Sequence, residues 1–242
     1  MKKLLRLLYS RYCLLVFALI FLVLTPLFWI SIQRPTWKNF ALKLNHWWAL
    51  WFFRISRIPR QEIYQEELSK DQPYVFCPNH TSFLDIPLLG LNGHRFVFVG
   101  KSSIAKVPLF GYMYKKIHIT VDRSKLKSKY RTLKLSKEQV EQGRSLVMFP
   151  EGGSSKNPPN LSDFKDGPFR VAIEQQIPVV PVTIPYNWII LPNHPSLMVN
   201  RTTAKIIYHA PIVTTGMDLH NLDQLKQQVN QVIAQELTKH SV

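Results

Sequence analysis

A histidine and a carboxylate stand five residues apart in NHTSFLD, residues 79–85, just after the apolar run 74–77. If the whole segment were helical, five steps of about 100° would leave His80 and Asp85 about 140° apart and unable to meet. We therefore expect His80 in a turn, Ser82 as the N-cap of a helix and Asp85 in its first turn. The carboxylate can then hold one ring nitrogen of His80, which leaves the other as a general base.

Two other interpretations of this segment stay open on its residues alone. Ser82 or Thr81 as a nucleophile would nominally complete a serine, histidine and aspartate set. The crowding of all three groups into one short loop argues against that geometry, and the chain contains no Gly-x-Ser-x-Gly turn. The third interpretation is that His80 only caps a helix or fills a polar turn.

A second carboxylate follows another apolar run, in LVMFPEGGSS, residues 146–155. Glu151 would be costly at the end of a core strand unless it had a partner, so we expect it to face the same cleft as His80. A glutamate in a solvated turn is the alternative. Gly152 and Gly153 would let the backbone approach a ligand closely.

The elements that position these groups alternate along the chain. Each expected strand is nearly all apolar, which predicts an α/β fold with a mostly parallel or mixed central sheet covered by helices on both faces. Sites in such sheets form outside the carboxyl ends of the strands, where His80 and Glu151 fall. The expected strands are 74–77, 96–99, 117–121, 146–149, 179–184 and 204–208, and the expected helices are 83–91, 126–141, 169–175 and 222–237.

The first quarter of the chain has a different composition. Residues 1–61 hold ten Lys and Arg and no Asp or Glu, and residues 12–32 are uncharged over roughly the 20 residues that cross a bilayer. Aromatic residues interrupted by cations follow over 37–55, a pattern typical of a helix in the lipid headgroup layer. We predict a membrane-anchoring helical hairpin over 1–58 and a catalytic domain over 59–242.

Two arrangements of this segment in the membrane are compatible with the sequence. Pro26 inside the apolar run and the polar second helix favour a monotopic hairpin that returns to the side it entered from; one complete span is the alternative. The basic start of the chain favours a cytoplasmic N-terminus. We therefore predict a location at the cytoplasmic face of a bacterial inner membrane, with membrane lipids as partners.

Several other classes of function are disfavoured. The basic excess, 31 Lys and Arg against 15 acids, lies mainly beside the apolar segment, so anionic lipid explains it better than nucleic acid. The two cysteines, Cys13 and Cys77, give neither a disulfide framework nor metal-ligand spacing. We expect no metal and no organic cofactor.

Taken together, four segments in order resemble the conserved blocks of the glycerolipid acyltransferases, especially the bacterial 1-acylglycerol-3-phosphate acyltransferases. NHTSFLD matches their Asn-His-four-residues-Asp block, and FPEG, residues 149–152, matches their Phe-Pro-Glu-Gly block. IHITVDR looks like the block that ends in an arginine, here Arg123, and IPVVPVTI looks like the last block. VGKSSIAKVPLFG, from Val99, is similar to the family's lysine-containing stretch.

The resemblance implies acyl transfer from a thioester of coenzyme A or of an acidic acyl carrier protein to the free hydroxyl of lysophosphatidic acid. His80 would be the general base and Asp85 its orienting partner, while Ser82 and Cys77 would be dispensable. A catalytically silent lipid-binding protein is the competing reading from another class. The residues that the resemblance assigns to substrate binding are Asn79, Lys101, Arg123, Glu151, Gly152, Gly153 and Lys165.

One departure from the family affects the acceptor. After Glu151-Gly the family usually continues Thr-Arg-Ser, whose arginine is thought to hold the acceptor phosphate, whereas this chain reads Gly153, Ser154 and Ser155. An acceptor without phosphate, such as a lyso-aminolipid, is therefore an alternative. Cations available as substitutes are Lys101, Arg123, Lys156 and Lys165, of which Arg123 and Lys101 are favoured because they fall in family-like blocks.

A basic run, KLKSKYRTLK, covers residues 125–134. Such a run is commonly a solvated helix face. It could also rest on anionic lipid or receive an acidic carrier protein.

Overall fold

The structure is a computed structural model that describes residues 2–122, 124–194 and 196–240. Seven strands of the described residues form one sheet, in the order β1-β7-β6-β2-β5-β3-β4. The strands are β1 Arg60–Tyr64, β2 Val75–Pro78, β3 Phe96–Lys101, β4 Ile119–Val121, β5 Ser145–Val147, β6 Val179–Thr183 and β7 Ala204–Tyr208. All neighbouring pairs are parallel except β6 with β7, so the predicted mixed α/β sheet is confirmed.

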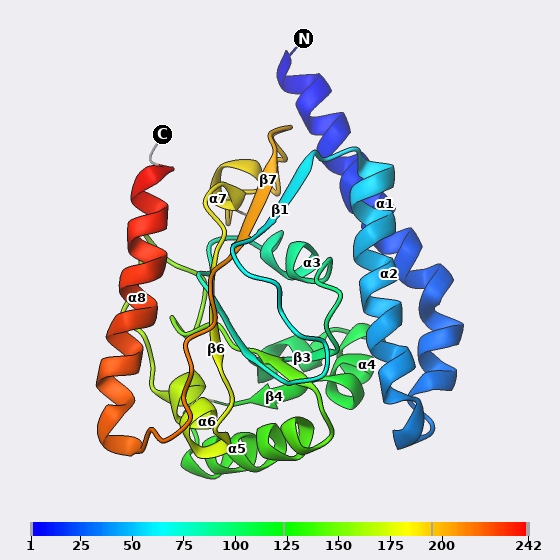
Figure 1. Cartoon of the computed structure of the whole chain (residues 1–242). Coiled ribbons are helices and arrows are strands. Elements are labelled where there is room, and N and C mark those ends of the chain that lie inside the picture. The colour runs from blue at the N-terminus through cyan, green and yellow to red at the C-terminus, as the bar shows by residue number, and fades with distance from the viewer. Residues whose placement is uncertain (1, 123, 195, 241–242) are drawn as a thin grey trace.

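Helices cover both faces of this sheet (Figure 1). On one face lie α5 Leu126–Glu141, α6 Gly167–Gln175 and α8 Leu222–Lys239; on the other lie α1 Lys2–Ser31, α2 Lys38–Ser56, α3 Asp85–Leu89 and α4 Phe110–Ile117. Short helices complete the chain: η1 Pro35–Trp37, η2 Ser102–Lys106, α7 Asn187–Ile190 and η3 Leu219–Asn221.

The alternation of side chains along a strand explains why the strands are apolar throughout. In β2, Val75 and Cys77 pack into one hydrophobic cluster, whereas Phe76 packs into the other. Successive side chains of a strand point to opposite faces, so a sheet with helices on both sides must be apolar at every position.

The N-terminal hairpin is part of this packed structure. Helices α1 and α2 run antiparallel beside each other, and α1 is long and apolar enough to cross a membrane. Trp48 and Phe52 of α2 are buried in the two hydrophobic clusters. We expected α2 to lie in the headgroup layer because of its amphipathic pattern. Burial against the protein accounts for the aromatic residues Trp48 and Phe52 in that pattern.

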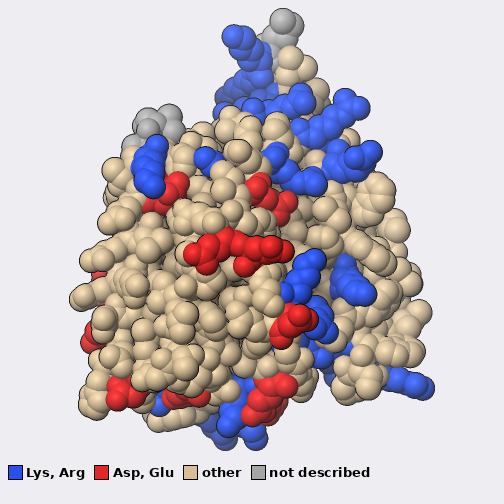
Figure 2. All heavy atoms as spheres, viewed as in Figure 1, with Lys and Arg blue, Asp and Glu red and all other residues tan. Residues whose placement is uncertain are grey.

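Lys and Arg gather at the open end of the hairpin in the view of Figure 2. The start of α1 and the end of α2 lie at this end. Its exposed basic residues are Lys2, Lys3, Arg6, Arg11, Arg54, Arg57 and Arg60. The opposite, closed end exposes Trp29, Ile30, Trp37 and Phe40, together with Arg34.

Two local expectations were wrong, and one strand was not expected. The polar stretch 59–71 contains the edge strand β1, because its backbone pairs in register with β7 from Arg60 opposite Ala204 onward. The expected strand 117–121 begins only at Ile119, since the preceding residues form the end of α4. The expected helix 83–91 is shortened to α3, because the backbone before Asp85 turns around the carboxylate of that residue.

Candidate active site

The predicted contact between His80 and Asp85 is present. Nδ1 of His80 donates to Oδ2 of Asp85 over 2.8 Å, and the Asp85 side chain is fully buried while that of His80 is 17% exposed. Among the described residues, Nε2 of His80 has no hydrogen-bond partner. In a neutral imidazole this contact places the proton on Nδ1 and leaves Nε2 able to accept a proton.

The carboxylate of Asp85 organises the turn that holds His80. Its Oδ2 also accepts the backbone N–H groups of Thr81 and Ser82, at 2.8 and 2.9 Å, and its Oδ1 accepts the side-chain amide of Asn187 at 2.8 Å. Four donors satisfy a carboxylate that would otherwise be costly to bury. Ser82 is not the N-cap that we expected, because the helix begins at Asp85 and Leu84 holds that position. The Ser82 hydroxyl accepts the N–H of Leu84 and donates to the carbonyl of Leu191.

The main chain of His80 joins the two predicted segments. Its N–H donates to Oε1 of Glu151 at 2.8 Å, and its carbonyl accepts the N–H of Ser155 at 2.7 Å. Oε2 of Glu151 accepts the N–H of Ser162 at 2.9 Å. Glu151 thus faces the same site as His80 and is not a solvated turn residue.

Burial raises the pKa of Glu151, and the N–H donors from Ser162 and His80 oppose that rise. Because both of its oxygens accept backbone N–H groups, the ionised form suits these contacts. Its contacts indicate that it holds the turn around His80 in place.

A cleft of about 600 Å³ opens beside the histidine. The ring of Phe149 stacks on that of His80, with centroids 4.0 Å apart, and lines this cleft together with Glu151 and Gly152. Apolar side chains from the ends of β3, β4 and α5 form much of the remaining wall. Among the described residues, the cations Lys129, Lys165 and Arg170 also line the cleft, as does the acid Asp166.

A second hollow, of about 750 Å³, lies on the other side of the glycine-serine turn. Ser154, Ser155 and Lys156 line it from one side, and Trp188 and Asn193 from the other. The turn that departs from the family pattern therefore separates two cavities. His80 itself lines neither cavity, and its contact with the first is through the stacked ring of Phe149.

The remaining predicted site residues have different settings. Asn79 is fully buried, and its side-chain amide bonds the backbone N–H and carbonyl of Ile184, so these contacts tie the ends of β2 and β6. Lys101 is exposed at the end of β3 and does not line either cavity. Gly152 has a φ of 77°, which favours glycine, whereas a Cβ on Gly153 would meet open space. Arg123 lies outside the described residues.

Sequence reasoning missed three contributors to the site. Asn187 donates to Asp85, Phe149 stacks on His80, and Arg170 lines the cleft. The rule that sites form beyond the carboxyl ends of parallel strands could have found Asn187, because it follows β6 directly. Nothing in the sequence distinguishes Arg170 from other surface cations, and it also pairs with Glu174.

The described residues contain no group of three or more His, Cys, Asp or Glu side chains that could hold a metal. The expectation that the chemistry needs no cofactor stays a prediction.

A histidine paired with a buried carboxylate, at the carboxyl edge of a helix-covered α/β sheet, is an arrangement that suits enzymes working by proton transfer. Comparison with known proteins specifies the class further. The sequence profile of the family described as Acyltransferase matches residues 60–185, a little over half of the chain, and that range includes His80, Asp85 and Glu151. The chain belongs to this acyltransferase family, as the resemblance of its motifs implied.

Curated relatives carry related names. The chain is 34% identical over 182 residues to the chloroplastic 1-acyl-sn-glycerol-3-phosphate acyltransferase of Arabidopsis thaliana, covering 73% of this chain and 51% of that protein. It is 30% identical over 145 residues to the lyso-ornithine lipid O-acyltransferase of Pseudomonas aeruginosa, covering 60% and 54% respectively. The chain thus spans about half the length of these relatives.

A solved structure shares the fold. The crystal structure of the 1-acyl-sn-glycerophosphate acyltransferase PlsC from Thermotoga maritima superposes with a TM-score of 0.80 at 20% identity. The match covers 99% of this chain and 97% of that one, so it includes the N-terminal hairpin as well as the sheet.

Proposed function

We propose that the protein transfers an acyl group from a thioester to the free hydroxyl of 1-acyl-sn-glycerol-3-phosphate, which is lysophosphatidic acid, to give phosphatidic acid. The observation that carries this proposal is the His80–Asp85 pair, in which Nε2 of His80 has no partner among the described residues. The ring of Phe149, which stacks on His80, lines a largely apolar cleft. Membership of the acyltransferase family and the names of the relatives support the reaction and the acceptor.

In the proposed step, the acceptor oxygen bonds to the thioester carbonyl carbon while Nε2 of His80 takes the hydroxyl proton. The tetrahedral intermediate then expels the thiolate, which recovers the proton from the imidazolium. The products are an ester and a free thiol. Asp85 stabilises the imidazolium through Nδ1.

Direct transfer needs no covalent acyl-enzyme. The Ser82 hydroxyl already donates to the carbonyl of Leu191 at 2.7 Å, which turns it away from the role of a nucleophile. Burial raises the pKa of the Cys77 thiol, which disfavours the reactive thiolate.

The oxyanion of the intermediate needs hydrogen-bond donors close to His80. Gly152 donates its N–H to the carbonyl of Phe149, so this group is already used. In the part of the chain that the structure describes, the N–H groups of Gly153 and Ser154 have no acceptor. Because the bonds from Glu151 and Ser155 to His80 bracket this turn, we assign the oxyanion to these two N–H groups.

The cations around the site suit a phosphate on the acceptor. Lys129, Lys165 and Arg170 border the cleft that holds Phe149, and an arginine among them can bind phosphate in a bidentate fork. Lys101 and Arg123, which we favoured from the sequence, stay predictions.

A lyso-aminolipid is the second candidate acceptor. It is favoured by Gly153 and Ser154, which stand where the family usually has Thr-Arg, and by the similarity to the lyso-ornithine lipid O-acyltransferase. Ser154 lines the second hollow, which contains only one cation, Lys156, among its described lining residues. Such a hollow suits a polar headgroup with little negative charge.

We also propose the cellular setting. The apolar helix α1 indicates membrane association. A location at the cytoplasmic face of a bacterial inner membrane would give the site access both to lipid acceptors and to thioesters of coenzyme A or acyl carrier protein. The chloroplast relatives are compatible with an equivalent stromal face, so the membrane itself is part of the proposal.

The direct test is acyl transfer by the purified, detergent-solubilised full chain from a long-chain acyl thioester to lysophosphatidic acid. The His80→Ala variant should lose about 10²- to 10⁴-fold in kcat, because it lacks the general base. His220→Ala is the matched control, since His220 is exposed and remote from the pair, and it should keep full activity.

An acceptor panel separates the two candidates. Turnover of lysophosphatidic acid far above that of lyso-ornithine lipid and monoacylglycerol supports phosphate recognition, whereas equal rates on all three exclude it. If wild type and His80→Ala are equally inactive on every acceptor while the wild type still binds lipid, the silent lipid-binding reading replaces the enzymatic one.

A further inference from the structure

Between η2 and α4 the chain exposes an apolar tip, residues 107–109. Val107 is 49% exposed and Leu109 is 42% exposed, and Tyr112 on the first turns of α4 is 46% exposed. Side chains of this size are not normally left in water as a contiguous group without a partner.

The backbone of the tip is held in an unfavourable conformation. Leu109 has φ 59° and ψ −59°, and the N–H of Phe110 donates to the carbonyl of Pro108 over 2.6 Å. These values describe a γ-turn of the rare, strained kind. Glycine would adopt it at little cost, so the presence of an outward leucine calls for a contact made by its side chain.

The tip is next to the apolar surface of the N-terminal helix. The rings of Trp29 and Tyr112 lie 5.7 Å apart and link α1 to α4. Trp29 itself is half-exposed and continues a strip of exposed α1 residues, Leu22, Val23, Leu27 and Ile30. A bilayer that takes up this strip of α1 therefore reaches Tyr112 and the tip.

Positive charge surrounds the tip. Lys106 precedes it, Lys115 and Lys116 follow on α4, and all three are exposed. The Lys116 ammonium lies 5.8 Å from the centre of the Tyr112 ring. An apolar centre with a lysine rim complements the acyl boundary and the headgroups of an anionic bilayer.

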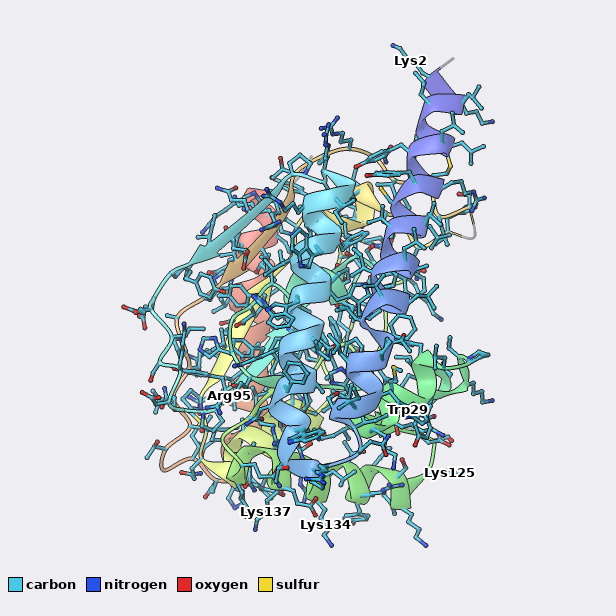
Figure 3. All side chains as sticks on the ribbon, turned by 90° about the vertical axis from the view of Figure 1, so that its right-hand side faces the viewer. Lys2, Trp29, Arg95, Lys125, Lys134 and Lys137 are labelled. Carbon is cyan, nitrogen blue, oxygen red and sulfur yellow. The ribbon has the colours of Figure 1, made fainter. Side chains whose placement is uncertain are left out.

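The start of α5 continues this character. Leu126 and Tyr130 are both exposed by more than half and alternate with the cations of the basic run. Figure 3 shows Lys125 and Trp29 on the same lower side of the molecule.

We propose that residues 107–109, with Tyr112 and the surrounding lysines, form a second membrane contact that inserts into an anionic lipid surface beside α1. The tip follows β3, and β3 pairs with β5, which leads into Glu151. Insertion would therefore hold the catalytic edge of the sheet against the bilayer. Only this last consequence depends on the proposed acyltransferase function.

The test measures contact with lipid directly. Cys13 and Cys77 are buried, so an environment-sensitive fluorophore on a single Val107→Cys label can be read in the full chain. The chain is placed, one copy per nanodisc, in phosphatidylglycerol discs with and without brominated acyl chains. The control is Val213→Cys, because Val213 is 60% exposed and follows Ile212, which bridges to Val179 at the start of β6, whereas the tip follows the carboxyl end of β3.

We expect emission from position 107 to shift to the blue and to be quenched by brominated lipid, while position 213 does neither. Equal, weak quenching at both positions overturns the proposal. A response at position 107 to added acyl carrier protein but not to brominated lipid also overturns it, and assigns the tip to that partner. A response that needs two copies per disc assigns it to self-association.

A second variant links the contact to turnover. Leu109→Gly relieves the strained turn, so its melting temperature should not fall below that of the wild type. Its KM for a long-chain acceptor in nanodiscs should rise about tenfold, with no change for a short-chain, water-soluble acceptor. An unchanged KM for both acceptors contradicts the functional consequence, while the fluorescence result remains independent of it.

Discussion

The four hydrogen bonds that Asp85 accepts have unequal chemical roles. The bonds from Thr81, Ser82 and Asn187 maintain the turn, whereas only the bond from His80 would change in the proposed proton transfer. Oδ1 of Asn187 is buried and unpartnered among the described residues, so this amide is free to reverse its orientation. A mutation at Asp85 can therefore keep the hydrogen bonds that hold the turn while removing the negative charge next to His80.

In Asp85→Asn, one amide oxygen can keep the three contacts of Oδ2 while the new NH₂ donates to a reversed Asn187. The variant should therefore melt close to wild type yet lose about 10²- to 10⁴-fold in kcat, because a neutral amide does not stabilise the imidazolium. Asp85→Ala should lose both activity and stability, since it leaves several buried donors unpaired. Thermal unfolding and kcat, measured on both variants, check this; Asp85→Asn within tenfold of wild-type kcat would contradict it.

His118 shows a histidine with a structural role. Its Nδ1 accepts the N–H of Phe98 on β3, and its Nε2 lies 3.3 Å from the Asn45 side chain on α2. Burial, with a smaller contribution from the Lys38 charge, lowers the pKa of His118 from 6.5 to about 3. The folded chain therefore keeps this imidazole neutral at pH values where the unfolded chain protonates it.

Stability should consequently fall as the pH drops from about 6.5 towards about 3, because the unfolded state binds a proton here that the folded state excludes. The free energy of unfolding is therefore expected to rise with pH across this window. The His118→Gln variant should show a weaker dependence of this free energy on pH. Denaturant titrations in detergent at pH 7.0 and about pH 5 measure the difference, and an equal loss in variant and wild type would assign it to other groups.

Single residues were predictable where their chemistry is distinctive. His80, Asp85 and Glu151 could be found because a carboxylate or imidazole at the end of an apolar strand is unusual. The roles of Thr81 and Ser82 were not predictable in the same way, because they act through backbone N–H groups that any residue could supply. The side chain of Ser82 suggested an N-cap, but the helix begins only at Asp85, and the Ser82 hydroxyl accepts the N–H of Leu84 and donates to the carbonyl of Leu191.

At the level of elements, α2 carries the contact between the membrane helix and the sheet. The Trp48 ring packs against Phe17 and Phe21 of α1, with centroids 4.5 and 5.1 Å apart, and its Nε1 donates to the carbonyl of Phe17. It also meets Phe110 of α4. One side chain therefore joins three helices.

Trp48→Ala should destabilise the protein by about 3–5 kcal/mol, because it removes a buried aromatic side chain and its neighbours cannot fully close the space. Trp51→Ala is the matched control on the same helix: Trp51 is 52% exposed, and its loss should cost less than about 1 kcal/mol. Chemical denaturation in one detergent gives both values. Similar losses for the two variants would mean that α2 is not held by this cluster.

Elements with strong apolar periodicity were predictable and short polar ones were not. β2, β3 and β6 could be recognised because both faces of a central strand are buried. β1 reads Arg-Gln-Glu-Ile-Tyr and lies at the edge of the sheet, so its pairing with β7 leaves no apolar pattern to recognise. The start of α4 was hidden for another reason, since the apolar residues before it are exposed.

At the scale of the whole molecule, the antiparallel hairpin returns the chain to the end where it began. The first residues of α1 and the first residues of β1 lie at the same end of the molecule in Figure 1. The parallel strands could be inferred from the alternation of elements, and with them the meeting of His80 and Glu151. The antiparallel direction of β7 relative to β6 could not be inferred, because the sequence of a short apolar strand does not indicate its direction in the sheet.

The hairpin arrangement predicts that the N-terminus and the catalytic domain face the same side of a membrane. Single cysteines at Lys3 and at Val213, both exposed, should react with an impermeant maleimide from the same side of sealed vesicles. Reaction of Lys3→Cys and Val213→Cys from opposite sides would establish one complete span by α1. Lysed vesicles, in which both positions must react, provide the control.

The stacking of Phe149 on His80 gains significance once the imidazole has taken its proton. In the resting state the two rings lie 4.0 Å apart as neutral aromatic partners. In the proposed reaction the imidazole becomes a cation lying against the negative face of the Phe149 ring, which is a cation–π contact. The attraction strengthens as the barrier is approached, so Phe149 would bind the transition state more tightly than the ground state.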